Sequence, residues 1–358
     1  ILMKKSHNFF SNLAFNLAEI HLGKTNTNPS VGCVVVKDDS VISSGVTSIS
    51  GRPHAEFNAL NNKKINFKDS VMYVTLEPCS HYGKTPPCTN LIRKKKIKKV
   101  YYCFDDPDLR SHKKAKKKLN GKIFKIKNNI SRNKDFYRSY FLNKEKNFPL
   151  IDAKIAISKD LYTINRKTKW ITNNKSRKAG HLLRSRYDCI ISTSTTINKD
   201  NSLLTCRING LDNYKPDLII IDRKLKLKKK LSLLNITKKR NTCIVTTSTN
   251  QKKISFFERK RIRIIKIQKL NCKNDFRKLF EKIFLIGKRR ILIETGLVFF
   301  NELIRYNLIN TLYIFKSGKS LKKLGANKIK LNVLKNYSSK NQIIVNLNDD
   351  KLFKVKVN

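Results

Sequence analysis

The chain has 358 residues and a formal net charge of +53, from 78 Lys and Arg against 25 Asp and Glu. At roughly 150 residues per domain, this length predicts two domains and excludes a single small module. Apolar residues make up 40% of the chain, with 19 Phe and 12 Tyr, which excludes a disordered polyelectrolyte. The charge leaves two interpretations open: a nucleic-acid-binding surface, or a compositional drift toward Lys, Asn and Ile around an ordinary enzyme.

The sequence also gives an indication of the cellular compartment in which the protein is located. No apolar run approaches the roughly 18 residues that a membrane span needs, and the first residues, 1–6, lack the apolar core of a signal peptide. Eight cysteines without a compact spacing framework fit a reducing environment better than a disulfide scaffold. We therefore expect a cytoplasmic protein with no membrane partner.

The first half of the chain has the pattern of a sheet covered by helices. The residues that predict an opening amphipathic helix recur at helical spacing: Phe9, Phe10, Leu13, Ala14, Leu17 and Ala18. Short β-branched runs predict strands over 31–36, 41–42, 71–76 and 100–104. Further helices are expected from near His54 and near Cys88, which gives an α/β order. Polarity rises at 143–147 without an apolar period, so we place the domains at 1–145 and 146–358.

The second half is again predicted to be α/β. Alternation at 151–157 indicates a strand, a helix is expected over 175–185, and a closing hairpin could join 343–345 with 352–355. Further strands are predicted over 189–192, 218–221, 243–246 and 291–293. No two of the twelve glycines are two positions apart, so there is no G-x-G-x-x-G fingerprint of a Rossmann domain.

One segment carries residues with metal chemistry. His54-Ala55-Glu56 is followed by Pro78-Cys79 and, nine positions later, by Cys88. One imidazole and two thiolates can hold a catalytic zinc with an open position for water. Glu56 would then remain free to move protons, as in the H-x-E and P-C-x-x-C signature of zinc deaminases, here with stretched cysteine spacing. The plain alternative is a solvated histidine at a helix start and two small buried thiols.

The longer run around these residues resembles a known family. The segments TLEPCSHYGKTPPC (75–88) and NPSVGCV (28–34) are similar to the deaminase half of the bifunctional riboflavin-biosynthesis deaminase/reductase. In the tRNA and nucleotide deaminases the two cysteines are closer together. Asn28 lies where that family places an Asn against the substrate, although a turn residue before Pro29 is an equal interpretation. The chain departs from the family where Asp108-Leu109-Arg110 replaces a usual Asn-Pro.

The resemblance implies what the first domain, 1–145, would do. It would be a cytidine-deaminase-like three-layer domain that removes an amino group hydrolytically from 2,5-diamino-6-ribosylamino-4(3H)-pyrimidinone 5′-phosphate. His54, Cys79 and Cys88 would hold Zn²⁺. Glu56 would be the catalytic proton carrier, protonating the ring nitrogen and then the leaving ammonia.

The resemblance extends to the second half, where family landmarks recur in order. It implies a dihydrofolate-reductase-like α/β domain over 146–358 that reduces the ribosyl group of 5-amino-6-(5-phosphoribosylamino)uracil to ribityl with NADPH. By position, the residues implied to contact NADPH are Ala156, Trp170, Thr196, Asp200 and Gly296. Those implied to contact the substrate are Thr168, Arg184, Leu204, Arg207 and Glu294. No acid or base for this reduction is identifiable from the sequence.

Two other functions remain to be weighed against this bifunctional enzyme. A nucleic-acid deaminase of the tRNA type, with a basic RNA-binding second domain, would use the +53 charge but needs stacking aromatics near the zinc. A basic RNA-binding protein with a structural zinc would need a fourth ligand. Because the cysteine spacing and the second half favour the riboflavin enzyme, we expect a small pyrimidine nucleotide as substrate, no nucleic-acid partner, and a homo-oligomer.

Overall fold

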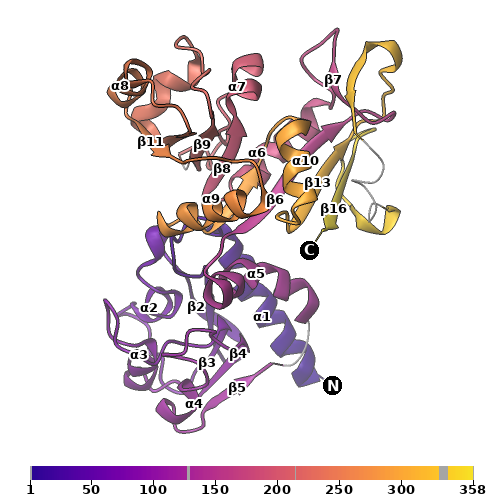
Figure 1. Cartoon of the computed structure of the whole chain (residues 1–358). Helices are drawn as coiled ribbons and strands as arrows, with labels where there is room; N and C mark the ends of the chain where they lie inside the picture. The colour runs from indigo at the N-terminus through magenta and orange to yellow at the C-terminus, as the bar shows by residue number, and fades with distance from the viewer. Residues whose placement is uncertain (1, 127–129, 214, 330–337, 358) are drawn as a thin grey trace. The chain divides into compact units, whose positions relative to one another are not determined.

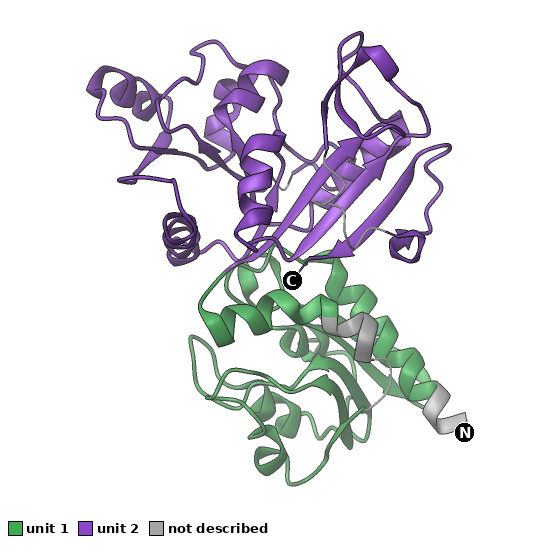
Figure 2. Ribbon diagram, turned by 45° about the vertical axis from the view of Figure 1, so that its right-hand side comes forward, with its two compact units in different colours: residues 1–148 green, residues 149–358 purple. Residues whose placement is uncertain are grey.

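The chain divides into two compact units, Ile1–Phe148 and Pro149–Asn358 (Figures 1 and 2). The computed structural model describes residues 2–126, 130–213, 215–329 and 338–357. The division falls a few residues after the boundary expected at 145. Both units are α/β, as the sequence patterns predict, and each is described by itself.

Unit 1 is built on a sheet with strand order β2-β1-β3-β4-β5. Strand β1 pairs antiparallel with β2 and β3, and the pairs β3–β4 and β4–β5 are parallel. The strands are β1 (Gly32–Lys37), β2 (Ser40–Val46), β3 (Val71–Leu76), β4 (Lys99–Phe104) and β5 (Ile123–Lys125). The helices are α1 (Leu2–Ile20), α2 (Ala55–Leu60), α3 (Cys88–Lys94), α4 (Ala115–Lys118) and α5 (Ile130–Lys146), with a 3-10 turn at Ile49–Gly51.

Strand β1 lies at the centre of this unit and is buried on both faces. Val34 and Val36 pack with Phe10 and Ala14 of α1, whereas Cys33 and Val35 belong to the cluster that contains the apolar face of α2. This alternation follows from the period of two in a strand. The unit therefore has helices on both faces of its sheet, the three-layer arrangement expected for it.

Helix α5 was not predicted, and it completes the core. Tyr137 is fully buried in the unit's main apolar cluster. Its hydroxyl lies 2.6 Å from Thr75 Oγ1 and donates to Ser30 O at 3.1 Å. The helix thus ties the end of β3 to the loop before β1, next to the segments that carry the zinc motif.

Unit 2 is built on a larger sheet with strand order β11-β10-β9-β8-β12-β6-β13-β16-β15. All neighbouring pairs from β11 to β13 are parallel, and β16 and β15 add an antiparallel edge. The strands are β6 (Leu150–Ile157), β8 (Cys189–Thr193), β9 (Asp217–Ile221), β10 (Thr242–Thr246), β11 (Ile262–Lys266), β12 (Arg290–Ile293), β13 (Thr311–Lys316), β15 (Gln342–Ile343) and β16 (Lys351–Lys356). A separate ribbon pairs β7 (Tyr162–Asn165) with β14 (Gly325–Lys328).

Helices connect the parallel strands of unit 2. They are α6 (Asn174–Arg184), α7 (Ser194–Asp200), α8 (Gln251–Arg259), α9 (Lys273–Leu285) and α10 (Leu297–Arg305), with 3-10 segments at Ser232–Lys239, Lys322–Leu324 and Ser339–Asn341. Strand β12 returns late in the chain to lie between β6 and β8. The strand order therefore reverses around β12, and in open parallel sheets ligands bind beyond the carboxyl ends of strands at such a point.

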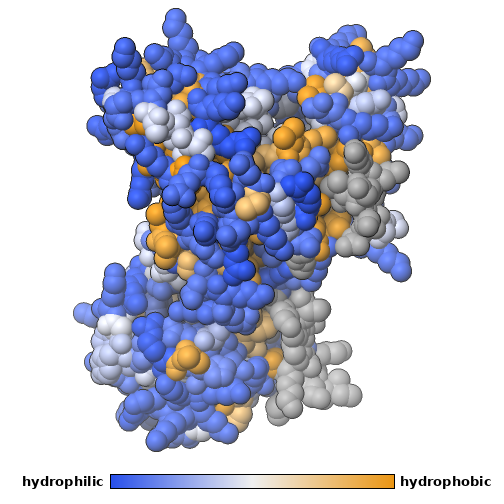
Figure 3. Space-filling model, in the orientation of Figure 1, coloured by the Kyte–Doolittle hydropathy of each residue, from blue (hydrophilic) through white to orange (hydrophobic). Residues whose placement is uncertain are grey.

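The surface is dominated by hydrophilic residues. On the face in Figure 3 they cover most of the molecule, and hydrophobic residues form separate patches. Among the described residues, no helix is long and apolar enough to cross a membrane.

Candidate active sites

Three metal-binding side chains converge in unit 1. His54 directly precedes α2, Cys79 lies in the loop after β3, and Cys88 is the first residue of α3. The Nδ1 atom of His54 lies 3.6 Å from Cys79 Sγ and 3.5 Å from Cys88 Sγ. Residues up to 34 positions apart thus form one group whose ligand atoms all lie within 4.8 Å of one another.

The chemistry of this group fits zinc. Hydrogen bonds from Cys88 and His54 lower the pKa of the Cys79 thiol to about 4, and the Cys88 backbone N–H donates to the same sulfur at 3.2 Å. This environment favours the thiolate, which is the form that binds zinc. Among the described residues the group has three ligands and no fourth, whereas a structural zinc needs four.

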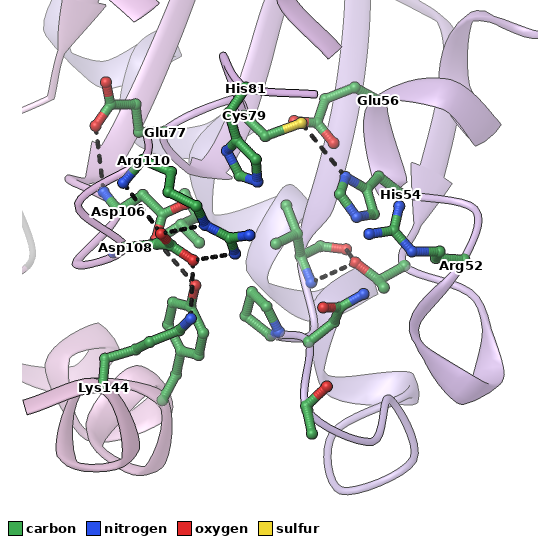
Figure 4. Close-up of a pocket in the computed structure, with 17 residues that line it drawn as sticks. Arg52, His54, Glu56, Glu77, Cys79, His81, Asp106, Asp108, Arg110 and Lys144 are labelled. Atoms are coloured by element: carbon green, nitrogen blue, oxygen red, sulfur yellow. Dashed lines mark hydrogen bonds and ion pairs between the residues drawn. The ribbon is translucent and has the colours of Figure 1, made fainter. Parts of the chain in front are cut away.

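Glu56 stands beside these ligands without being one of them. It is the second residue of α2 and is only 4% exposed. Burial raises the pKa of Glu56 to about 7, and the charge on Cys79 acts in the same direction. Figure 4 shows its carboxylate next to Cys79, across from the His54 ring.

His54, Glu56 and Cys79 line a cavity of about 180 Å³. Asn28, which the resemblance sets against the substrate, also lines the cavity, and its Nδ2 donates to Gly51 O at 2.7 Å. His81 lies in the wall with its Nδ1 2.7 Å from Ser111 Oγ. The rest of the lining is Thr27, Pro29, Val31, Thr47, Arg52, Leu76, Glu77, Asp106, Asp108, Arg110, Tyr140 and Lys144.

A second site takes shape in unit 2, from residues far apart in the sequence. Arg184, at the end of α6, makes two hydrogen bonds with the carboxylate of Glu294, at 2.5 and 2.9 Å. Burial opposes the charge of Glu294, but Arg184 outweighs it and lowers the pKa of Glu294 to about 2. Arg207 lies nearby, with its backbone N–H 3.2 Å from Nδ1 of His181. Leu204 is buried in the adjoining core.

Lys154 is a residue of this site that the sequence patterns did not identify. Its Nζ lies 3.7 Å from Glu294 Oε2 and over the ring of Phe315. Burial lowers the pKa of Lys154. Lys154 and Ala156 are the two less buried positions of β6, and they lie on one face of the strand because residues i and i+2 do. The available signal was a lysine inside a strand whose other residues, apart from Asp152, are apolar.

Two helix starts meet beside this cluster. Helix α7 follows β8 and α10 follows β12, which is the neighbouring parallel strand. The Gly296 N–H donates to Thr196 Oγ1 at 3.1 Å, which joins the two starts. Thr196 N–H is itself bound to Thr193 Oγ1 at 3.3 Å, but backbone N–H groups in the first turn of a helix, together with its dipole, suit a phosphate group.

The remaining predicted residues lie in the segment after β7 and at the end of α7. Thr168 donates to the carbonyl of Trp170 at 3.0 Å, and Lys169 Nζ donates to Asp200 O at 2.7 Å. Trp170 is half-exposed, with Arg177 over its ring. The hydrogen bond from Lys169 therefore holds the 168–170 segment against the end of α7.

Comparison with known proteins assigns the two units. Residues 4–104 match the cytidine and deoxycytidylate deaminase zinc-binding region, and residues 149–321 match the RibD C-terminal domain. The riboflavin biosynthesis protein RibD of Aquifex aeolicus is 33% identical over 76% of this chain and 77% of its own length. The corresponding protein of Buchnera aphidicola is 33% identical over 87% of each chain. The chain belongs to the RibD family.

A solved structure supports the same fold over the whole chain. The deaminase/reductase of Thermotoga maritima, named for diaminohydroxyphosphoribosylaminopyrimidine and 5-amino-6-(5-phosphoribosylamino)uracil, is 26% identical with a TM-score of 0.79 and covers 99% of both chains. The expected fold class is confirmed, with a cytidine-deaminase-like domain followed by a RibD reductase domain.

Membership of this family decides between the functions weighed above. The protein is an enzyme of riboflavin biosynthesis with a zinc-dependent deaminase and an NADPH-dependent reductase. A tRNA-type deaminase with an RNA-binding second domain is not favoured, because the second unit matches a reductase. Small nucleotide-like substrates fit this family.

Proposed function

We propose that unit 1 deaminates 2,5-diamino-6-ribosylamino-4(3H)-pyrimidinone 5′-phosphate and that unit 2 reduces the ribosyl group of the product, 5-amino-6-(5-phosphoribosylamino)uracil, to ribityl. The observation that carries the proposal is the convergence of His54, Cys79 and Cys88 at a cavity that the buried Glu56 also lines, within a chain related to RibD over most of its length.

In unit 1, His54, Cys79 and Cys88 would hold the zinc. Zinc in such a site activates a water molecule for attack on the amine-bearing carbon. Glu56 would carry both protons of the water: its carboxylate takes the first and delivers it to the ring nitrogen, then takes the second from the added hydroxyl and delivers it to the amino group, which leaves as ammonia. The cavity wall would hold the pyrimidine ring next to the Glu56 carboxylate. The net result of the hydrolysis is that a carbonyl oxygen replaces one amino group.

In unit 2, the joined starts of α7 and α10 would bind the phosphates of the cofactor. The residues assigned to NADPH are Ala156, Trp170, Thr196, Asp200 and Gly296, and those assigned to the substrate are Thr168, Arg184, Leu204, Arg207 and Glu294. NADPH supplies a hydride for C1′ of the open imine form of the ribosyl group. Lys154 would give the proton that the imine nitrogen must gain, with Glu294 Oε2 3.7 Å from its Nζ to orient the ammonium.

Incubation of the zinc-loaded protein with the diaminopyrimidine nucleotide, with and without NADPH, tests both steps. Without NADPH we expect the deaminated ribosyl compound and ammonia; with NADPH we expect the ribityl compound and NADP⁺ in equal amounts. The control is the protein after chelation of its zinc, which should form neither product from this substrate. A zinc-loaded protein that releases no ammonia contradicts the proposal.

The expected cytoplasmic location and homo-oligomeric assembly are part of the same proposal. No disulfide joins the eight cysteines, all of which the structure describes, and this suits a reducing compartment. Size-exclusion chromatography with light scattering checks the assembly, and a monomer at working concentration would contradict it.

A further inference from the structure

We propose that Arg110 and Lys144, both anchored on Asp108, bind the phosphate of the deaminase substrate and so select the phosphorylated pyrimidine. This inference rests on the proposed function of unit 1. It concerns the wall of the cavity that the segment after β4 and helix α5 supply. This wall lies beyond residue 104, where the match to the deaminase zinc-binding region ends.

Asp108 holds both cations. Arg110 donates to it through Nε and Nη2, at 2.9 and 2.6 Å, and Lys144 donates through Nζ at 2.8 Å. The two cations come from different elements, the loop after β4 and helix α5. One carboxylate therefore fixes two long side chains beside each other in the cavity wall, and the cluster keeps a net positive charge.

The cations, and not the carboxylate, face the open space. The side chain of Asp108 is 10% exposed, against 63% for Arg110 and 35% for Lys144. Arg110 Nη1 makes no hydrogen bond with any described residue. Figure 4 shows the Arg110 guanidinium extending into the cavity below His81, with Lys144 beyond it.

Hydrogen bonds fix the loop after β4 that carries Asp108 and Arg110. The buried carboxylate of Glu77 accepts hydrogen bonds from the backbone N–H groups of Asp106, Lys113 and Ala115, at 2.9 to 3.2 Å. Tyr140 of α5 donates to Asp106 Oδ1 at 2.9 Å. Because this loop is fixed by hydrogen bonds, Arg110 is already in position before the ligand binds, which lowers the entropic cost of binding.

The positions of Arg110 and Lys144 in the cavity match the shape of the substrate. His54, Cys79 and Glu56 line one part of the cavity, and Arg110 and Lys144 line another part of it (Figure 4). A ribosylamino-pyrimidine phosphate has its reacting ring and its phosphate at opposite ends. Guanidinium and ammonium groups are strong donors to phosphate oxygens, so the charged end of the substrate would meet the charged wall.

Arg52 is the competing cation. It also lines the cavity, but it belongs to the segment before α2 and its Nη1 donates to Thr85 Oγ1 at 2.6 Å. It lies next to His54 in Figure 4, at the reacting end. The test therefore includes an Arg52 variant to decide which cation selects the phosphate.

The experiment measures kcat/KM for ammonia release from the nucleotide and from the same compound after removal of its phosphate. The proteins are the full zinc-loaded chain, Arg110→Ala, Lys144→Met, Arg52→Ala and a matched control, Lys117→Met, on the exposed face of α4. Zinc content and the circular dichroism spectrum are recorded for each variant to show that it is folded.

We expect the unmodified chain to prefer the nucleotide. Arg110→Ala and Lys144→Met should each lower kcat/KM for the nucleotide by about 10- to 100-fold, mainly through KM, and leave the dephosphorylated compound unaffected. Lys117→Met should change neither value. Equal losses for both compounds, an unmodified chain without preference, or loss of the preference in Arg52→Ala alone would each overturn the inference while leaving the proposed deamination intact. Failure of the unmodified chain on both compounds would contradict the proposed function itself.

Discussion

Glu56 is the residue on which the proposed deamination depends most directly. Glu56→Gln keeps the shape of the side chain but removes its capacity to take a proton, so we expect deamination to fall by about 10²- to 10⁴-fold. Zinc content should stay unchanged, because Glu56 is not among the three ligands. Ammonia release and metal analysis on the same sample check this. A variant that loses zinc yet keeps its activity would reverse the assignment of roles.

Glu294 should govern the stability of unit 2. Glu294→Gln leaves Arg184 buried without its partner, so the free energy of unfolding should fall by about 3–5 kcal/mol. Because the pKa of Glu294 in the folded chain is lowered to about 2, this stabilisation is present in full above the usual carboxyl pKa and is lost as pH falls toward 2.

Urea unfolding followed by the fluorescence of Trp170, the single tryptophan, checks the pH dependence in unit 2. The difference between the unmodified chain and Glu294→Gln should be large at pH 7 and should narrow below about pH 4. An equal difference at both pH values would mean that the carboxylate charge does not stabilise the unit.

The residues differ in how far the sequence could predict them. His54, Cys79 and Cys88 were predictable because few residue types bind zinc and their spacing is a motif. Arg110 and Lys144 were not, since solvated cations are common in this composition and only the fold brings them together. Lys154 was missed for a related reason. The strand pattern predicts that 151–157 is extended, but it does not predict which residues of other strands contact Lys154.

At the level of elements, the strands were predicted better than the helices that follow them. Strands β1, β3, β4 and β8 lie within a residue or two of the predicted ranges, because buried β-branched runs are a local signal. Helix α5 was not predicted, and the rise in polarity at 143–147 falls on its end. Its many polar and charged residues interrupt the apolar period in the sequence, so the aromatic face that contains Tyr137 could not be recognised.

The contact between α1 and β1 gives a prediction about an element. A Cβ added at Gly32 would lie 1.8 Å from the backbone oxygen of Ala14. Gly32→Ala must therefore push α1 away from the sheet, and we expect the melting temperature of unit 1 to fall by several degrees. Gly83→Ala is the control, because its added Cβ would meet nothing closer than 3.6 Å. Equal melting curves for the two variants would contradict the close contact.

At the level of the whole molecule, the two units each have their own core. Removal of the zinc site should therefore stop one reaction and spare the other. Cys79→Ser should lose zinc and deamination, yet still reduce separately supplied 5-amino-6-(5-phosphoribosylamino)uracil at the rate of the unmodified chain. Oxidation of NADPH at 340 nm measures this, and a matching loss of reduction would show that the units depend on each other.

The net charge of +53 belongs to the whole chain, and it should act mainly through self-repulsion. Salt screens repulsion between exposed lysines, so the melting temperature should rise between about 20 mM and about 0.5 M NaCl. KCl should have the same effect, because screening does not depend on the cation. A melting temperature that falls with both salts would contradict this.

Helix α5 has a consequence for how the two activities could ever be separated in a gene. The family match for the deaminase ends at residue 104, but Asp108, Arg110, Tyr137 and Lys144 follow that point, and α5 ends at Lys146, just before β6 begins at Leu150. Only Asn147, Phe148 and Pro149 lie between them. A gene division that yields a separate deaminase with its complete cavity wall would therefore have to fall within the codons for these three residues.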